Sequence, residues 1–184
     1  MALQKRQDEL FWDEASGGWF STTGQDPTVL LRMKEDYDGA EPSASSVSVL
    51  NLIILSHLHH EPAWTARIER TLRLYGQRLE QIGRAVPMLA CALAAYISGL
   101  QQVIVVGDGP KAAALLDAAS SRYRPFSLAL LLTPSTQREL ASVAPFLASL
   151  GARDGEAVAY VCRDFACQAP LTDPADLARA LSNV

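Results

Sequence analysis

The sequence predicts an α/β protein in two parts, a helical part over residues 1–99 and a small βαβαβα domain over residues 100–184. Before Gly99, an apolar segment, an amphipathic segment and a second apolar segment follow one another, as the inner and outer helices of an αα-hairpin toroid require. After Gly99, three apolar or β-branched runs alternate with helical segments, which indicates parallel strands joined by right-handed crossovers. We therefore expect part of an αα toroid and then a three-stranded parallel α/β/α unit.

The helical part begins with a short amphipathic helix that Gly17 and Gly18 end. The runs "WFSTT" and "TVLLRM", separated by the turn sequence "GQDP", suit two strands. They predict a small β-hairpin or an ordered excursion between helices. Residues 46–58 are apolar on most sides and predict an enclosed helix, whereas residues 63–83 carry apolar side chains at spacings of three and four and predict a half-exposed one. Pro87 opens a second enclosed helix.

The second part contains strand-like runs at residues 101–106, 126–133 and 156–163. Helical segments follow each of them, and the last begins at Asp173, a good N-cap, with Pro174 in the first helical position. The glycines of "GDGPKA" after the first run fit a phosphate-binding loop. However, Asp108 places a negative charge there and no acid follows the second run, so we interpret the glycines as a tight turn. We predict no cofactor and no metal.

The composition narrows the class of protein. Of the 184 residues, 49% are hydrophobic and 20% are charged, so a packed core is expected. The net charge of −4 disfavours binding to nucleic acid. The start has no signal-peptide pattern, and the longest apolar stretch, residues 86–100, is shorter than the ~20 residues that a bilayer span needs. Three cysteines cannot form a complete disulfide framework, so we expect a cytoplasmic protein without membrane contact.

The most unusual segment is "RMKEDYDGAEPSASS", which concentrates acids and bases before a run of serines. In an extended backbone Asp36 and Asp38 point the same way about 7 Å apart, within the roughly 5–9.5 Å of carboxyl pairs in glycoside hydrolases. Asp36, Asp38 and Glu41 are therefore candidate catalytic residues, with Lys34 holding an ionised carboxylate. The other interpretation is a solvated loop whose serines cap the next helix. The candidate substrate-binding residues are Lys34, Arg32, Ser43 and Ser45.

Cys162 and Cys167 lie in "VCRDFACQAP" after the third predicted strand. Their C-x-x-x-x-C spacing departs from the C-x-x-C of redox motifs, and a zinc site would need two more ligands. The two thiols can nevertheless come within reach of one another. A thiol redox role for this pair is therefore a further hypothesis.

The segments "GGWFSTTGQDPTVLLRMKEDYDGAEPSASSVSVLNLI" and "AVAYVCRDFACQAPLTDPADL" resemble the C-terminal portion of the spermatogenesis-associated protein 20-like family. The resemblance covers essentially the whole chain. The family pattern K-E-D-x-D-G-A-E-P-S is matched from Lys34 to Ser43, and the asparagine that usually follows is replaced by Ser45. Members of this family look like two large parts. An N-terminal thioredoxin-like domain is followed by a long helical region that is similar to six-hairpin, glycosidase-like (α/α)6 toroids.

The resemblance implies that this chain contains the tail of the toroid and the terminal α/β piece, without the thioredoxin-like domain. It places the acidic segment at the mouth of the toroid, where similar toroids bind sugars. An incomplete ring would expose inner-helix surface, which favours association. We expect a fragment that serves as a non-catalytic binding or scaffold module, whose partner is the missing N-terminal region or a second copy. A carbohydrate-binding or carbohydrate-processing site with epimerase- or glycosidase-like acid/base chemistry is the alternative.

Overall fold

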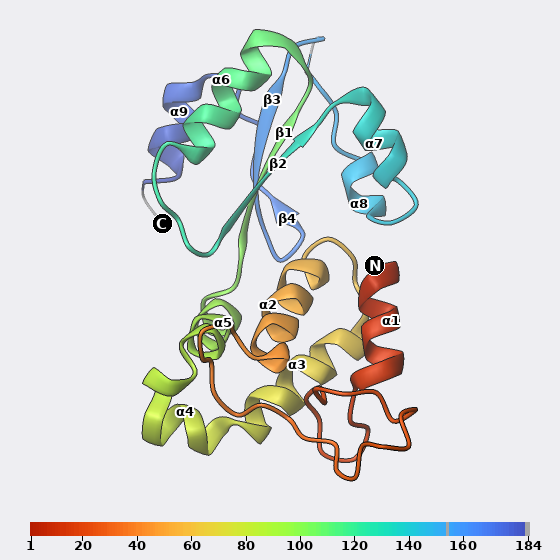
Figure 1. Ribbon diagram of the computed structural model, residues 1–184. Helices are drawn as coiled ribbons and strands as arrows, with labels where there is room; N and C mark the ends of the chain where they lie inside the picture. The colour runs from red at the N-terminus through yellow and green to blue at the C-terminus, as the bar shows by residue number, and fades with distance from the viewer. Residues whose placement is uncertain (154, 183–184) are drawn as a thin grey trace. The chain divides into compact units, whose positions relative to one another are not determined.

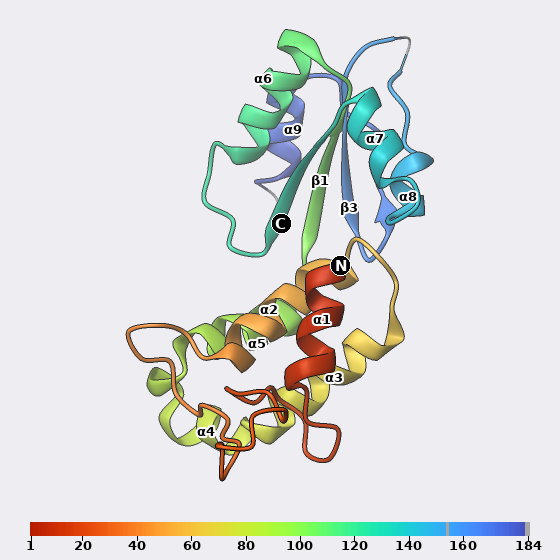
Figure 2. The ribbon, with the colours of Figure 1, turned by 45° about the vertical axis from the view of Figure 1, so that its right-hand side comes forward.

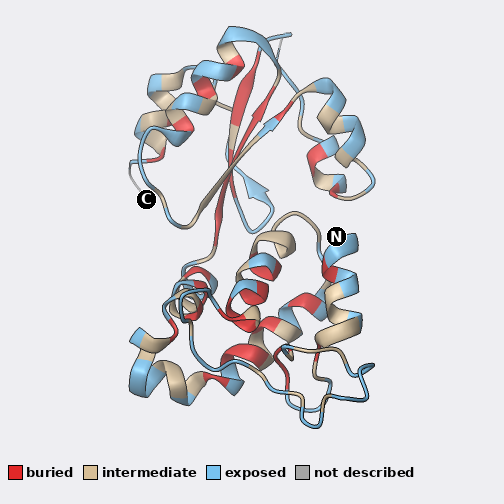
Figure 3. Ribbon diagram, in the orientation of Figure 1, coloured by how far each residue is buried: buried red, intermediate tan, exposed pale blue. Residues whose placement is uncertain are grey.

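The computed structural model describes residues 1–153 and 155–182. The chain divides into two compact units (Figure 1). Unit 1 comprises Met1–Ser56 and His60–Ile97, and unit 2 comprises His57–His59 and Ser98–Val184. Helices make up unit 1, and a mixed sheet with helices makes up unit 2, so the α/β class is confirmed. Figure 3 shows buried residues on the packed sides of the helices and along the central strands.

Unit 1 is built from helices of contrasting character. The apolar sequence segments form α2 and α5. The amphipathic helix α3 packs on α2 with its apolar face (Figure 2). No helix in the part of the chain that the structure describes is long and apolar enough to cross a bilayer. The helices of unit 1 are α1 (Ala2–Phe11), α2 (Ala44–Ser56), α3 (Pro62–Leu74), α4 (Gly76–Ile82), a 3₁₀ turn (Gly83–Ala85) and α5 (Pro87–Ser98).

The amphipathic segment at residues 63–83 was predicted as one helix and is two. The break lies at Tyr75, whose backbone has φ −97° and ψ 8° and whose N–H donates to the carbonyl of Thr71. Gly76 follows directly, and glycine weakens a continuous helix at this point. The buried Tyr75 side chain also donates from its hydroxyl to the carbonyl of Glu35, 3.2 Å away. The helix therefore breaks at the residue whose side chain makes this tertiary hydrogen bond. The spacing of the apolar residues did not reveal the break.

The predicted β-hairpin within residues 12–43 is wrong. Trp12 and Trp19 form a single antiparallel bridge, and no strand forms in this segment, all of which the structure describes. Leu30 and Leu31 are 99% and 74% exposed, so "TVLLRM" has no buried face to pair as a half-buried strand would. The N–H of Trp19 donates instead to the Ser45 hydroxyl. The segment is the ordered excursion that the sequence offered as the other reading.

Unit 2 contains a four-stranded sheet in the order β2-β1-β3-β4. The strand β1 pairs with β2 in parallel and with β3 in antiparallel orientation, and β3 pairs with β4 in antiparallel orientation. Figure 1 shows α6 and α9 on one face of the sheet and α7 and α8 on the other. The elements are β1 (Gln101–Val106), α6 (Gly109–Ser120), β2 (Ser127–Leu132), α7 (Pro134–Leu140), α8 (Pro145–Ala148), β3 (Val158–Arg163), β4 (Ala166–Cys167) and α9 (Pro174–Ala180).

The three-stranded parallel sheet was therefore a wrong prediction, because the third strand runs the other way. One long crossover helix would have returned the chain to the start of β1. Instead the connection breaks into the short helices α7 and α8, and the chain enters β3 opposite the end of β1, with Val158 facing Val106. A parallel strand needs a crossover that spans the sheet, and an antiparallel neighbour does not.

The glycine turn after β1 has a structural explanation. Gly107 has φ +129°, and a Cβ on it would lie 2.7 Å from the Cβ of Ala157. The close approach occurs where β3 begins beside β1, so only glycine fits without movement of the chain. This role accounts for Gly107 without a bound nucleotide.

Candidate functional site

Lys34 ties the later part of the excursion to its beginning, the turn that follows α1. Its Nζ lies 2.6 Å from Asp13 Oδ2 and donates to the Ser16 hydroxyl and the Gly17 carbonyl, each also at 2.6 Å. Hydrogen bonds from Lys34 and Ser16 hold the pKa of Asp13 well below its usual range. The ammonium also lies 5.0 Å from the centre of the Phe20 ring. Lys34 is thus committed to bonds within unit 1.

Arg32 has a similar structural role. Its Nη2 donates to the carbonyls of Thr22 at 2.9 Å and Leu10 at 3.1 Å. The guanidinium carbon lies 4.0 Å from the centre of the Phe20 ring, a cation–π contact. These hydrogen bonds join Arg32, in the later part of the excursion, to the end of α1 and to Thr22 in the earlier part. Arg32 does not line the pocket in which Lys34 lies.

Asp38 caps the helix α5. Its Oδ2 accepts from the N–H groups of Met88 at 2.8 Å and Leu89 at 3.4 Å, and its Oδ1 accepts from the N–H of Ser43 at 2.9 Å. Burial alone would raise the pKa of Asp38, but the hydrogen bonds from Ser43, Ser46, Met88 and Leu89 outweigh it and lower that pKa. The carboxylate therefore stays ionised, as an acceptor for helix N–H groups rather than a proton donor.

The serines are buried at the beginning of α2. The Ser43 hydroxyl accepts from the N–H of Ser46 at 3.2 Å and caps the helix, as the second interpretation of the sequence expected. The Ser45 hydroxyl accepts from the N–H of Trp19 at 3.1 Å and from the Tyr75 hydroxyl at 3.5 Å. Glu41, by contrast, is exposed at the surface. The structure places Ser43 and Ser45 in the packing of unit 1.

A polar pocket of about 450 Å³ lies where the excursion crosses the junction of α3 and α4. Of the predicted site residues it contains Lys34 and Asp36, and Asp36 forms an ion pair with Arg78. The side chain of Asp36 is half exposed. The pocket residues that the sequence reasoning missed are Leu74, Tyr75, Gln77, Arg78 and Gln81. Gln77, Arg78 and Gln81 are polar side chains on neighbouring turns of the amphipathic segment, and this pattern was the available signal.

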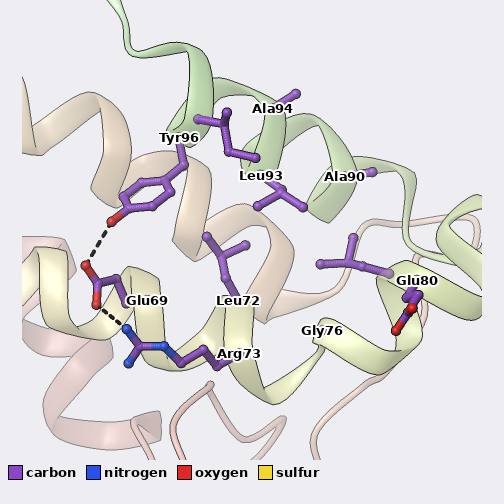
Figure 4. A pocket seen from close by; sticks show the side chains of 11 residues that line it. Glu69, Leu72, Arg73, Gly76, Glu80, Ala90, Leu93, Ala94 and Tyr96 are labelled. Atoms are coloured by element: carbon purple, nitrogen blue, oxygen red, sulfur yellow. Dashed lines mark hydrogen bonds and ion pairs between the residues drawn. The ribbon is translucent and has the colours of Figure 1, made fainter.

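A larger and mostly apolar groove of about 830 Å³ lies between α3, α4 and α5 (Figure 4). Its floor and walls include Leu72, Leu79, Leu93 and Ile97. Ile97 is 75% exposed although its neighbours are apolar. The groove is open, and no part of unit 1 covers it.

One end of this groove is polar. Glu69 accepts from Arg73 Nη2 at 2.7 Å and from the Tyr96 hydroxyl at 2.9 Å, as Figure 4 shows. Burial and the bond to the Glu69 carboxylate raise the pKa of Tyr96, so the phenol keeps its proton and donates it. The groove thus combines an apolar floor with one fixed polar corner.

The two cysteines of unit 2 form a disulfide bond. Cys162 in β3 faces Cys167 in β4, and Cys162 is buried while Cys167 is exposed. The remaining cysteine, Cys91, is free and exposed on α5. The redox hypothesis therefore concerns a pair that the structure brings together.

The chain is similar to proteins of animals. It is 35% identical over 184 residues to human spermatogenesis-associated protein 20, 36% identical over 185 residues to the rat protein of that name, and 30% identical over 170 residues to an uncharacterized protein of Caenorhabditis elegans. The first two matches cover 98% of this chain and 23% of the relative, so the chain spans about a quarter of the curated relatives' length. No family model matches the chain, and no solved structure is significantly similar to it.

Proposed function

Because the chain belongs to the spermatogenesis-associated protein 20 family and spans 23% of its human relative, we propose that it is a non-catalytic docking module. In this proposal the helices of unit 1 are part of an (α/α)6 toroid, and the rest of the family architecture completes the ring. The observation that carries the proposal is the uncovered apolar groove of α3, α4 and α5. The module works in the cytoplasm, without membrane or nucleic acid.

The occupant that fits the groove is an amphipathic helix from the remainder of the family polypeptide. Such a helix would cover Leu79, Leu93 and Ile97 with apolar side chains and meet the Glu69–Arg73 corner with a polar one. Full burial of one Leu or Ile contributes about 1.5–3 kcal/mol, so covering the exposed Ile97 alone is a substantial gain. Exposed apolar surface of this kind marks an interaction site.

The contacts of the residues between Lys34 and Ser43 support a non-catalytic module. Lys34 and Asp38 are engaged by hydrogen bonds within unit 1, and Asp38 is held in its ionised form. General acid catalysis needs a carboxyl group that carries a proton near working pH. Of the three acids in the predicted catalytic set, Asp36 is the one beside the polar pocket.

The test uses the human relative. The part of that protein which this chain does not match is produced separately and mixed with this chain, and light scattering after size exclusion gives the mass of the product. We expect a one-to-one complex that the substitution Leu93→Glu abolishes. Tyr123→Glu is the matched control, because Tyr123 is 92% exposed in unit 2 and should leave the complex intact. Self-association of this chain alone, abolished by Leu93→Glu, would instead assign the groove to a second copy. Equal behaviour of both variants would refute the docking role.

A second candidate function is carbohydrate binding at the polar pocket. The observation that favours it is the grouping of Asp36, Arg78, Gln77 and Gln81 beside the ring of Tyr75, since hydroxyl-rich ligands need both donors and acceptors. Nuclear magnetic resonance titration with a panel of neutral mono- and disaccharides tests it. We expect shifts at these residues that Asp36→Asn weakens at least tenfold. A panel without any shift would remove this candidate.

A further inference from the structure

The end of β3 carries an uncommon combination of features. Cys162 and Cys167 face each other across the β3–β4 ladder and are disulfide-bonded, with only four residues between them in the sequence. The strand β4 has two residues and forms the edge of the sheet. One further hydrogen bond, from the N–H of Gln168 to the carbonyl of Val161 at 2.9 Å, continues the pairing. The disulfide is thus the covalent cross-link that joins β4, a very short edge strand, to β3.

The turn between the two strands is strained. Asp164 and Phe165 have φ values of +49° and +63°, the left-handed backbone that a two-residue hairpin turn of this type requires at both positions. Asparagine and glycine suit such positions, whereas a bulky side chain there is a rare outlier. The Phe165 ring is 40% exposed and contacts the Phe146 ring at 5.1 Å between centres. Strained backbone of this kind clusters at active sites, ligand clamps and switch regions.

The two cysteine residues also differ in exposure. Cys162 is 1% exposed, whereas Cys167 lies at the surface. A thiolate from solution therefore reaches Cys167 first. In a reducing compartment, a disulfide of this kind is usually transient and redox-sensing.

We propose that Cys162 and Cys167 form a thiol–disulfide exchange site for dithiols, and that its reduction releases residues 163–168 from the edge of the sheet. A thiolate of the dithiol attacks the Sγ of Cys167, the S–S bond breaks, and the sulfur of Cys162 leaves as a thiolate and takes up a proton. The second thiol of the dithiol then attacks the mixed disulfide. The sulfur of Cys167 leaves and is protonated, and the dithiol becomes a disulfide. Two electrons and two protons pass to the protein.

The experiment uses the full chain with Cys91→Ser, so that the pair supplies all thiols. The chain is equilibrated with graded ratios of reduced to oxidised dithiothreitol, and alkylated thiols are counted by mass spectrometry. Hydrogen exchange is measured on the same samples. We expect the count to rise from zero to two while β1 and the buried part of β3 stay protected and residues 163–168 lose protection. Reduction that occurs only together with loss of protection in β1 would overturn the proposal, as would two free thiols before any reductant is added.

Two variants test the role of the turn. Phe165→Asn places a residue that tolerates left-handed backbone in the same position, so the oxidised form loses its strain. The reduction midpoint should then move to a roughly fivefold or greater ratio of reduced to oxidised dithiol. Phe146→Leu is the matched control, because it removes the ring contact and leaves the turn unchanged, and it should move the midpoint less than twofold. An unchanged midpoint in Phe165→Asn would show that the turn stores no strain against the disulfide and would overturn the proposal.

Discussion

Replacing Asp38 by alanine should destabilise unit 1 without affecting any chemistry. The carboxylate accepts three backbone N–H groups, from Ser43, Met88 and Leu89, and the bond to Leu89 is long at 3.4 Å. Loss of a helix N-cap costs about 1 kcal/mol, and each hydrogen bond to a charged group contributes about 1.5–3 kcal/mol. Counting the cap and the tie to Ser43 gives an expected loss of about 2.5–4 kcal/mol in the free energy of unfolding.

The measurement is urea unfolding followed by circular dichroism, with hydrogen exchange of the first turn of α5 as the local probe. Asp38→Asn keeps the shape and one acceptor oxygen, so it should lose about half as much as Asp38→Ala. Glu41→Ala is the control, since Glu41 is exposed and its substitution should change the free energy by less than about 0.5 kcal/mol. A similarly small effect of Asp38→Ala would refute the capping role and return Asp38 to the list of candidate acids.

The remaining predictions concern pH, Lys34 and Gly107. Because the folded-state pKa of Asp38 is lowered, its contribution is present above the unfolded-state pKa of about 3.9 and is lost as pH falls through the folded value, so unfolding curves of the parent and Asp38→Asn should converge in acid. Lys34→Met should cost about 1.5–3 kcal/mol in urea unfolding by leaving Asp13 without its cation, and a loss near zero would contradict the bracing role. Gly107→Ala should cost about 2 kcal/mol or more through the clash with Ala157, whereas Gly151→Ala, with open space around it, should change the melting temperature little.

The sequence predicted most elements whose signal is local. The apolar segments became α2 and α5, and the run "QQVIVV" became the central strand β1. The cap at α9 was also correct, since the Asp173 carboxylate accepts from Ala175 and Asp176 and Pro174 opens the helix. These features follow from periodicity and capping, which a single segment carries within itself.

The wrong predictions concern segments whose structure depends on residues far away in the sequence. The direction of β3 depends on how the chain returns from α8, which no property of "AVAYVCR" encodes. "TVLLRM" has the composition of a strand but is anchored through Arg32, whose partners Leu10 and Thr22 lie elsewhere in the chain. Composition describes what a strand could bury, and it does not say whether a neighbour is there to pair with it.

The candidate site shows the same division. The segment from Lys34 to Ser43 is unusual, as the sequence indicated. Lys34, Asp38 and Ser43 form ties and helix caps within unit 1. Asp36 and Glu41 stay at the surface. Asp36 joined a pocket with Arg78 and Gln77 from α4, a pairing that needs the fold to be known. The apolar groove was not predicted from the sequence. A helix face that is left exposed within its own unit has the same sequence pattern as a face buried in the core.

The docking role is tested most directly by a hydrogen-exchange footprint of this chain, alone and mixed with the unmatched part of the human relative. The account predicts that protection rises in residues 69–80 and 90–97, which line the groove, and that Leu93→Glu removes that rise. Protection that appears only in unit 2, or none at all at saturating concentrations of both polypeptides, would contradict it.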